Sequence, residues 1–140
     1  MSYYRFSLPS QLSFADQLRR WVATLSSIEG YGEQFSSVLW LSVHEAFVNA
    51  VLHGNQSDPE QPVVMLFESG WKGGARFLEV QIRDFGKGFD LAPQLAATRL
   101  EAACSRPCGR GLLLMNHYAA NLTVERLLDG CVVLMRYIPY

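Results

Sequence analysis

The alternation of apolar and polar residues predicts a strand at the start of the chain. In YYRFSL, residues 3–8, apolar side chains on one face alternate with arginine and serine on the other, as in a half-buried strand. Apolar residues then recur at helical spacing to about residue 28, and Ser13 and Asp16 have the spacing of a capping box at the start of that helix. The glycines of GYG, residues 30–32, are expected to end it.

A second, longer helix is predicted over residues 33–54, with Gly54 as its left-handed C-terminal cap. This helix is mostly apolar, yet Glu45, Asn49 and His53 recur at every fourth position. At about 100° per residue, the three side chains fall within an arc of about 80° and form a polar stripe on a buried helix. The stripe needs a polar partner, which a ligand or a polar network between helices would supply.

Two further apolar runs predict a β-hairpin. VVMLFE, residues 63–68, and ARFLEVQIRD, residues 75–84, read as strands joined by a turn through SGWKGG. In the second strand, apolar residues alternate with polar ones, so one face of the sheet is expected to meet water. The same period of two places Asp84 on the apolar face. A carboxylate there is costly unless another group donates a hydrogen bond to it.

The rest of the chain is predicted to contain a long loop, a short helix and two strands. Residues 85–108 lack periodicity and contain several glycines and prolines, which is typical of a functional loop. A helix is expected over 111–118, followed by the strands NLTVERL and CVVLMRYI, which are joined at Asp129 and Gly130. This order of elements predicts an α+β fold, a two-layer α/β sandwich with helices on one face of a mixed, mainly antiparallel sheet.

Composition limits the number of domains and the kinds of partner. With 140 residues, of which 49% are apolar and 18% charged, the chain can form one core, so residues 1–140 are expected to be a single domain. A net charge of -1 argues against nucleic acid or a membrane surface as the main partner. No apolar run approaches the length of a membrane span, and no secretory signal is recognised. Three cysteines without a CxxC pair argue against a disulfide framework or a zinc site. A cytoplasmic domain is expected.

Three short motifs contain residues that could bind a nucleotide. The amide oxygen of Asn49 could bind a hard cation such as Mg²⁺, while the Glu45 carboxylate could accept a proton. In DFGKGF, residues 84–89, the two glycines let the backbone approach a flat ligand whose donor Asp84 would accept. GRG, residues 109–111, stands where a helix begins, which is an anion site. Taken singly, a polar helix contact or an ordinary turn explains each motif equally well.

The ordered set EAFVNAVLHGN, DFGKGF and GRGLLLM resembles the N, G1 and G2 boxes of the GHKL (histidine-kinase-like) ATPase superfamily. The close spacing of the boxes, the HGNQSDP loop and the total length are most similar to its bacterial anti-sigma factor and serine-protein kinase branch. The resemblance implies a Bergerat-type ATP-binding fold, ATP and Mg²⁺ as cofactors, and an ATP lid at about 85–108. Its partners would be a sigma factor and an anti-anti-sigma (antagonist) protein. Relatives of this kind often pair, so a homodimer is also expected.

The resemblance also implies a role for individual residues. Glu45 would be the general base, Asn49 would coordinate Mg²⁺, and Asp84 would accept a hydrogen bond from the adenine amino group. The other nucleotide-binding positions are His53, whose role stays open, Gly86, Lys87, Gly88, Gly109, Arg110, Gly111 and Leu112. The protein would phosphorylate a serine or threonine of the antagonist and, with nucleotide bound, sequester the sigma factor or a similar target.

One departure from the family pattern leaves a second function open. Relatives often have Gly-Thr between the last two strands, with the threonine near adenine, whereas this chain has Gly130 and Cys131. A thiol is a poorer hydrogen-bonding group, which predicts weaker nucleotide binding. The chain could thus be a partner-binding module that uses ATP without phosphoryl transfer. A histidine kinase is disfavoured because no helix with a phospho-accepting histidine precedes the boxes, and a eukaryotic-type protein kinase because HRD- and VAIK-like motifs are absent.

Overall fold

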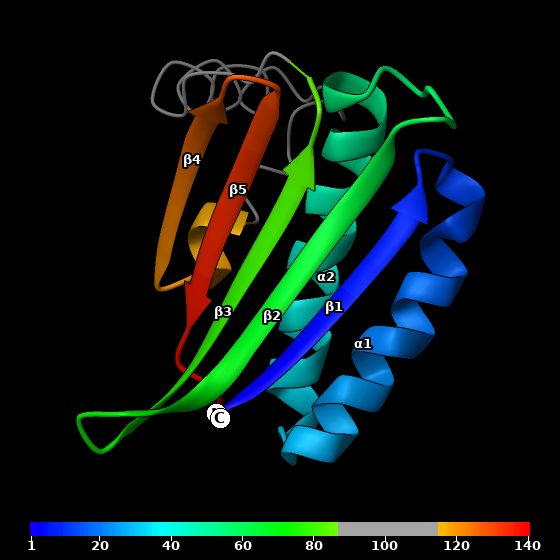
Figure 1. Ribbon diagram of the computed structural model, residues 1–140. Coiled ribbons are helices and arrows are strands. Elements are labelled where there is room, and N and C mark those ends of the chain that lie inside the picture. The colour runs from blue at the N-terminus through cyan, green and yellow to red at the C-terminus, as the bar shows by residue number, and fades with distance from the viewer. Residues whose placement is uncertain (87–114) are drawn as a thin grey trace, which may run out of the picture.

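The computed structural model describes residues 1–86 and 115–140. In this part of the chain a five-stranded sheet has the order β1-β2-β3-β5-β4. Both long helices lie on the same side of it (Figure 1). The elements are β1 (Ser2–Pro9), η1 (Leu12–Phe14), α1 (Ala15–Glu29), α2 (Glu33–Asn49), η2 (Ala50–Gly54), β2 (Pro62–Lys72), β3 (Ala75–Asp84), β4 (Asn121–Leu127) and β5 (Gly130–Tyr137).

The sheet confirms the predicted α+β architecture. Every strand pair formed by the described residues is antiparallel, including β1 with β2, although two helices separate these strands in sequence. In β3, the alternation of residues buries Leu78, Val80 and Ile82, as predicted, against the helix layer. Asp84 ends that strand and lies opposite Cys131 of β5. The end of β3 therefore meets the start of β5.

The central helix α2 forms much of the core, because its apolar side chains face the sheet. The fully buried residues include Leu39, Val43 and Phe47 from α2, and Met65 and Met135 from the strands. Together, α2 and η2 form a helix of 22 residues that is long and apolar enough to cross a membrane by length and composition alone. The core helix of a globular domain passes the same test, and the buried residues of this helix belong to the core.

The first helix ends as predicted but begins differently. Gly30 adopts a left-handed conformation with φ of 70°, and its N–H donates to the carbonyls of Ser26 and Ser27, which caps α1. The predicted capping box is wrong. Ser13 lies within the 3-10 turn η1, and α1 starts at Ala15 without a side-chain cap. Because η1 runs directly into α1, Ser13 lies inside a helical turn and Phe14 occupies the N-cap position.

The second helix does not run as one α-helix to a left-handed Gly54, which corrects the prediction. The α-helix stops at Asn49, and Ala50–Gly54 is π-helical. The residues with positive φ come later, at Gln56 (51°) and Ser57 (57°). Glu45 and Asn49 therefore lie on the α-helix, whereas His53 lies in the π-helical segment that follows it.

The predicted hairpin is present, but its strands are longer than expected. Residues 69–72 belong to β2, and the turn consists of Gly73 and Gly74 alone, with φ of 59° and 79°. Two consecutive positive φ angles are characteristic of a type I′ hairpin turn, which glycine tolerates without strain. The β2–β3 hairpin projects beyond the neighbouring strands (Figure 1).

The last predicted elements are also present where the structure describes them. Residues 115–118 are helical, and Met115 and Ala119 are buried, as the predicted helix requires. The strands β4 and β5 follow, and they pair antiparallel with Leu127 opposite Gly130.

Candidate functional site

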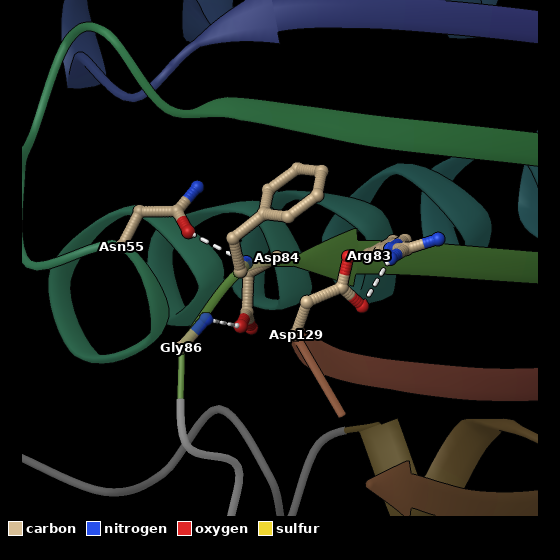
Figure 2. A network of polar contacts seen from close by, with 6 residues as sticks. Asn55, Arg83, Asp84, Gly86 and Asp129 are labelled. Atoms are coloured by element: carbon tan, nitrogen blue, oxygen red, sulfur yellow. Dashed lines mark hydrogen bonds and ion pairs between the residues drawn. The ribbon is translucent and has the colours of Figure 1, made fainter. Parts of the chain in front are cut away.

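Asp84 lies on the core side of the sheet, as predicted, and is only 6% exposed. Its Oδ1 accepts a hydrogen bond of 2.8 Å from the backbone N–H of Gly86 (Figure 2). Glycines surround it closely. A Cβ atom on Gly54 would overlap the Asp84 carboxylate, and one on Gly130 would overlap the Asp84 carbonyl. Gly54 is therefore required by the close approach of η2 to Asp84, and not by a left-handed cap.

The described residues donate a hydrogen bond to one of the two Asp84 carboxylate oxygens. Burial raises the pKa of the Asp84 carboxyl above its ordinary value, and the hydrogen bond from Gly86 lowers it by less. Oδ1 is used by Gly86, whereas Oδ2 has no hydrogen-bond donor among the described residues. A carboxylate oxygen that accepts no hydrogen bond from the described residues can accept one from a ligand.

We expect Asp84→Asn to raise the free energy of unfolding near pH 7. Because the folded pKa of Asp84 is higher than its unfolded pKa, ionisation of this group destabilises the folded state above the folded pKa. That penalty disappears as the pH falls through the folded pKa toward the unfolded one. The stability advantage of the asparagine protein, measured by urea denaturation, should therefore shrink as the pH is lowered from 7. A less stable variant at pH 7, or an advantage that does not change with pH, would contradict the assignment.

Glu45 and Asn49 lie one turn apart on α2, and both are half-buried. Within the described residues, the side chain of Asn49 forms no hydrogen bond, and Glu45 has only His44, whose Nδ1 is 3.9 Å from Glu45 Oε1. The His44 ring packs against Trp40, with the ring centroids 5.3 Å apart. The polar contact between helices that could have explained this pair is thus not formed by the described residues. Among the described residues, neither group is engaged in a hydrogen bond that would keep it from a ligand.

A pocket opens at the end of η2, beside Asp84. Its volume is about 580 Å³, which is within the range of small-molecule sites. Two predicted nucleotide-binding residues, His53 and Gly86, line it, and His53 is exposed. Glu45, Asn49 and Asp84 do not line it. The other lining residues are Gly54, Asn55, Gln56, Gln61, Phe85, Leu127, Leu128 and Asp129.

Two buried polar residues of this region were not predicted from the sequence. Asn55 is 6% exposed and Ser10 is completely buried, and Asn55 Nδ2 donates to Ser10 Oγ over 2.8 Å. Asn55 Oδ1 accepts from the backbone N–H of Phe85 over 2.7 Å (Figure 2). Both residues lie in polar loop sequence, where exposure is the ordinary expectation. The only signal in the sequence is the position of Asn55 as the last residue of the N-box motif EAFVNAVLHGN.

Arg83, near the end of β3, links this strand to the turn between β4 and β5. Arg83 Nη2 is 2.8 Å from Asp129 Oδ1 (Figure 2), and the Arg83 guanidinium lies 4.9 Å from the centroid of the Phe85 ring. Such contacts, partly exposed to solvent, are individually weak. They join the residues on both sides of Asp84 to the turn that precedes Cys131.

The structure therefore brings part of the predicted site together. Gly86 is hydrogen-bonded to Asp84 and lines a pocket with His53, while Glu45 and Asn49 lie on the preceding helix. The remaining candidates lie outside the described residues, as does most of the predicted lid at 85–108; they are Lys87, Gly88, Gly109, Arg110, Gly111 and Leu112. The open groups suit a nucleotide: Asn49 offers an amide oxygen to Mg²⁺, and Asp84 offers a buried acceptor to a base. Phosphate oxygens would have to complete the Mg²⁺ coordination.

Comparison with known proteins identifies the family. The model of the histidine kinase-like ATPase domain family matches residues 8–137. A search of curated proteins gives no significant match. Among solved structures, the RsbU and RsbW domains of Rv1364c from Mycobacterium tuberculosis superpose with a TM-score of 0.70 at 13% sequence identity. That match covers 99% of this chain and 33% of the other, so this chain spans about a third of the solved chain that it matches. At this identity the likeness supports the fold, whereas the family model matches almost the entire sequence, and the chain belongs to the histidine kinase-like ATPase domain family.

Proposed function

We propose that this domain, residues 1–140, binds ATP with Mg²⁺ and phosphorylates a serine or threonine of an anti-anti-sigma (antagonist) protein. In its nucleotide-bound state it would sequester a sigma factor or a similar target in the cytoplasm. Membership of the ATPase family, and a fold shared with a chain that contains an RsbW domain, support this proposal. The observation that carries it is the buried Asp84 carboxylate, whose Oδ2 has no donor among the described residues.

The proposal gives each open group one task. Asp84 Oδ2 accepts a hydrogen bond from the adenine amino group, and the close packing of Gly54 against Asp84 and of Gly86 against Gly54 holds this carboxylate in place. Asn49 would hold Mg²⁺ through its amide oxygen. The metal would supply positive charge that stabilises the charge developing on the phosphate. His53, beside Gly86, is kept as a candidate nucleotide contact.

The residues beyond the described part complete the proposed site. The lid, at about 85–108, would cover the nucleotide, and Lys87 and Gly88 belong to its first residues. Gly109, Arg110, Gly111 and Leu112 would hold the phosphates at the start of the next helix, where backbone amides attract anions. The arginine would also neutralise developing phosphoryl charge.

In the proposed reaction, the acceptor hydroxyl oxygen attacks the γ-phosphorus of ATP. The bond between that phosphorus and the bridging oxygen of ADP breaks, and the hydroxyl proton passes to the Glu45 carboxylate. The products are the phosphorylated antagonist and ADP. Glu45 is half-buried and has no salt bridge with Lys or Arg among the described residues, so its carboxylate is free to take the proton.

The experiment that tests this function is a transfer assay. The protein is incubated with ATP labelled on the γ-phosphate and with the products of neighbouring genes, and one of them should become labelled. Serine and threonine phosphates survive acid, whereas a histidine phosphate is hydrolysed by it. An acid-stable label supports the proposal, an acid-labile label favours the histidine kinase alternative, and no label on any candidate contradicts both.

A second candidate function is a partner-binding module that uses ATP only to select a conformation. The observation that favours it is Cys131, which is fully buried opposite Asp84 at the position where relatives often have threonine. Under this alternative, the protein binds its partner in an ATP-dependent way, Glu45→Gln leaves that binding unchanged, and no phosphoryl transfer is detected. Transfer that Glu45→Gln abolishes would exclude it.

Cys131 also gives a prediction on affinity. We expect Cys131→Thr to tighten ATP binding about two- to tenfold, because a neutral hydrogen bond contributes about 0.5–1.5 kcal/mol. Cys131→Val is the matched control, since valine has the shape of threonine without its hydroxyl. Calorimetric titration of the three proteins with ATP checks the result. Equal affinities for the threonine and valine proteins would show that a hydroxyl here does not contact the nucleotide.

A further inference from the structure

The side chain of Asn55 joins three segments that are far apart in sequence. Its Nδ2 donates to Ser10 Oγ over 2.8 Å, just after β1, and to the carbonyl of Pro62 over 3.1 Å, at the start of β2. Its Oδ1 accepts from the N–H of Phe85, just after β3. Ser10 Oγ in turn donates to the carbonyl of Gln61 over 2.6 Å. The carboxamide thus has partners on both its donor and its acceptor side, and it lies in the interior.

The backbone around Asn55 has an unusual conformation. The N–H of Asn55 donates to Ala50, and that of Ser57 to Val51, over 2.8 and 2.7 Å. Between these bonds, Gln56 and Ser57 both have positive φ, which disfavours residues with a side chain. Such conformations persist only where the surroundings hold them, and they concentrate at functional sites. Here the turn places Asn55 between the ends of three strands.

The contact between Asn55 and Phe85 lies directly beside the candidate adenine acceptor. Asp84 is the last β3 residue paired with β5, so the next two amides need other partners. The amide of Phe85 donates to Asn55, and that of Gly86 donates to Asp84 itself (Figure 2). Gly54, which precedes Asn55, packs against the Asp84 carboxylate so closely that no Cβ would fit. Asn55 therefore joins the end of η2 to Phe85, the residue after Asp84. This hydrogen bond lies next to the close contact between Gly54 and Asp84.

We propose that Asn55 is a positioning residue for nucleotide recognition, with Ser10 as its support. It fixes the turn of Asp84, Phe85 and Gly86 relative to η2, and so the orientation in which the second carboxylate oxygen of Asp84 meets the base. This deepens the proposed function and rests on it. The carboxamide of Asn55 is already engaged by Ser10, Pro62 and Phe85, so Asn55 acts through Asp84.

The test measures affinities for ATP, ADP and adenosine by calorimetry, with folding monitored by circular dichroism. Asn55→Ala should weaken binding of all three ligands by a similar factor of about ten, because they share the base that Asp84 would hold. Ser10→Ala, which removes only the support, should weaken it about two- to fivefold. Asn121→Ala, at an exposed asparagine that begins β4, is the control and should bind as the wild type does.

A double variant separates positioning from mere stabilisation. If Asn55 acts through Asp84, adding Asn55→Ala to Asp84→Asn should weaken binding by less than it does in the wild type, since both changes remove the same interaction. If Asn55 only stabilises the fold, its variants melt earlier while the folded protein keeps wild-type affinity, and the inference is overturned. Should Asn55→Ala not fold, an unchanged affinity of Ser10→Ala overturns it. A folded wild type that binds no nucleotide overturns the proposed function together with this inference.

Discussion

Replacing Glu45 with glutamine is expected to slow phosphoryl transfer by about 10²- to 10⁴-fold, the usual contribution of a general base. Glutamine keeps the size of the side chain and cannot take the proton of the acceptor hydroxyl. ATP affinity should stay within about twofold of the wild type, because the group acts on the attacking hydroxyl and not on the nucleotide. Single-turnover transfer of labelled phosphate to the antagonist, together with calorimetric titration with ATP, measures the two quantities separately.

Glu33→Gln is the matched control for this variant. Glu33 begins the same helix, is exposed, and lies at the end of α2 opposite the site. Its variant should transfer phosphate at the wild-type rate. A Glu45→Gln protein that binds ATP normally and also transfers phosphate normally would remove Glu45 from the mechanism. Loss of both binding and transfer would instead assign Glu45 to nucleotide binding.

Asp84→Asn is expected to weaken ATP binding by about 10- to 150-fold, corresponding to the loss of a charge-assisted hydrogen bond of about 1.5–3 kcal/mol. The carboxylate offers two acceptors, of which one already holds the N–H of Gly86. Asparagine has a single acceptor oxygen, so its amide group would face the adenine amino group with one donor against another. Titration with ATP, ADP and adenosine should show the same loss for all three.

This loss of affinity should accompany the gain in stability expected near pH 7, so the same substitution separates the two roles of Asp84. Asp16→Asn is the control, because Asp16 is an exposed residue of the first turn of α1. Unchanged ATP affinity in a folded Asp84→Asn protein would show that this carboxylate does not hold the base. An earlier thermal transition with unchanged affinity would make Asp84 a purely structural residue.

The main elements could be predicted because their periodicity reflects simple burial. Alternation in β3 placed Asp84 on the core side, and this was correct because a strand reverses its side chains at every residue. The turn at Gly73 and Gly74 was predicted too wide. The residues SGWK, 69–72, show no alternation that marks them as a strand. They extend β2 because they pair with residues 75–78 of β3.

Tertiary contacts explain what the sequence did not reveal. Gly54 seemed to be a helix cap, although it is needed because η2 touches Asp84, a contact between residues 30 positions apart. The Asn55 network was not predicted for the same reason, since its partners come from the ends of three strands. Periodicity does not report which polar residues such distant segments bury together. The roles proposed for Glu45, Asn49 and Asp84 come from the family resemblance. The supporting residues Asn55 and Ser10 become visible only in the structure.

The measurement that tests the central claim most directly is calorimetric titration of the folded wild-type protein with ATP and ADP, each with and without magnesium. We predict binding of both nucleotides, with ATP binding strengthened by Mg²⁺ because Asn49 and the phosphates would share the metal. Absence of binding by a protein whose circular dichroism shows the folded state would contradict the account. The three motifs would then remain as scaffold, and capture of a protein partner without nucleotide would become the function to test.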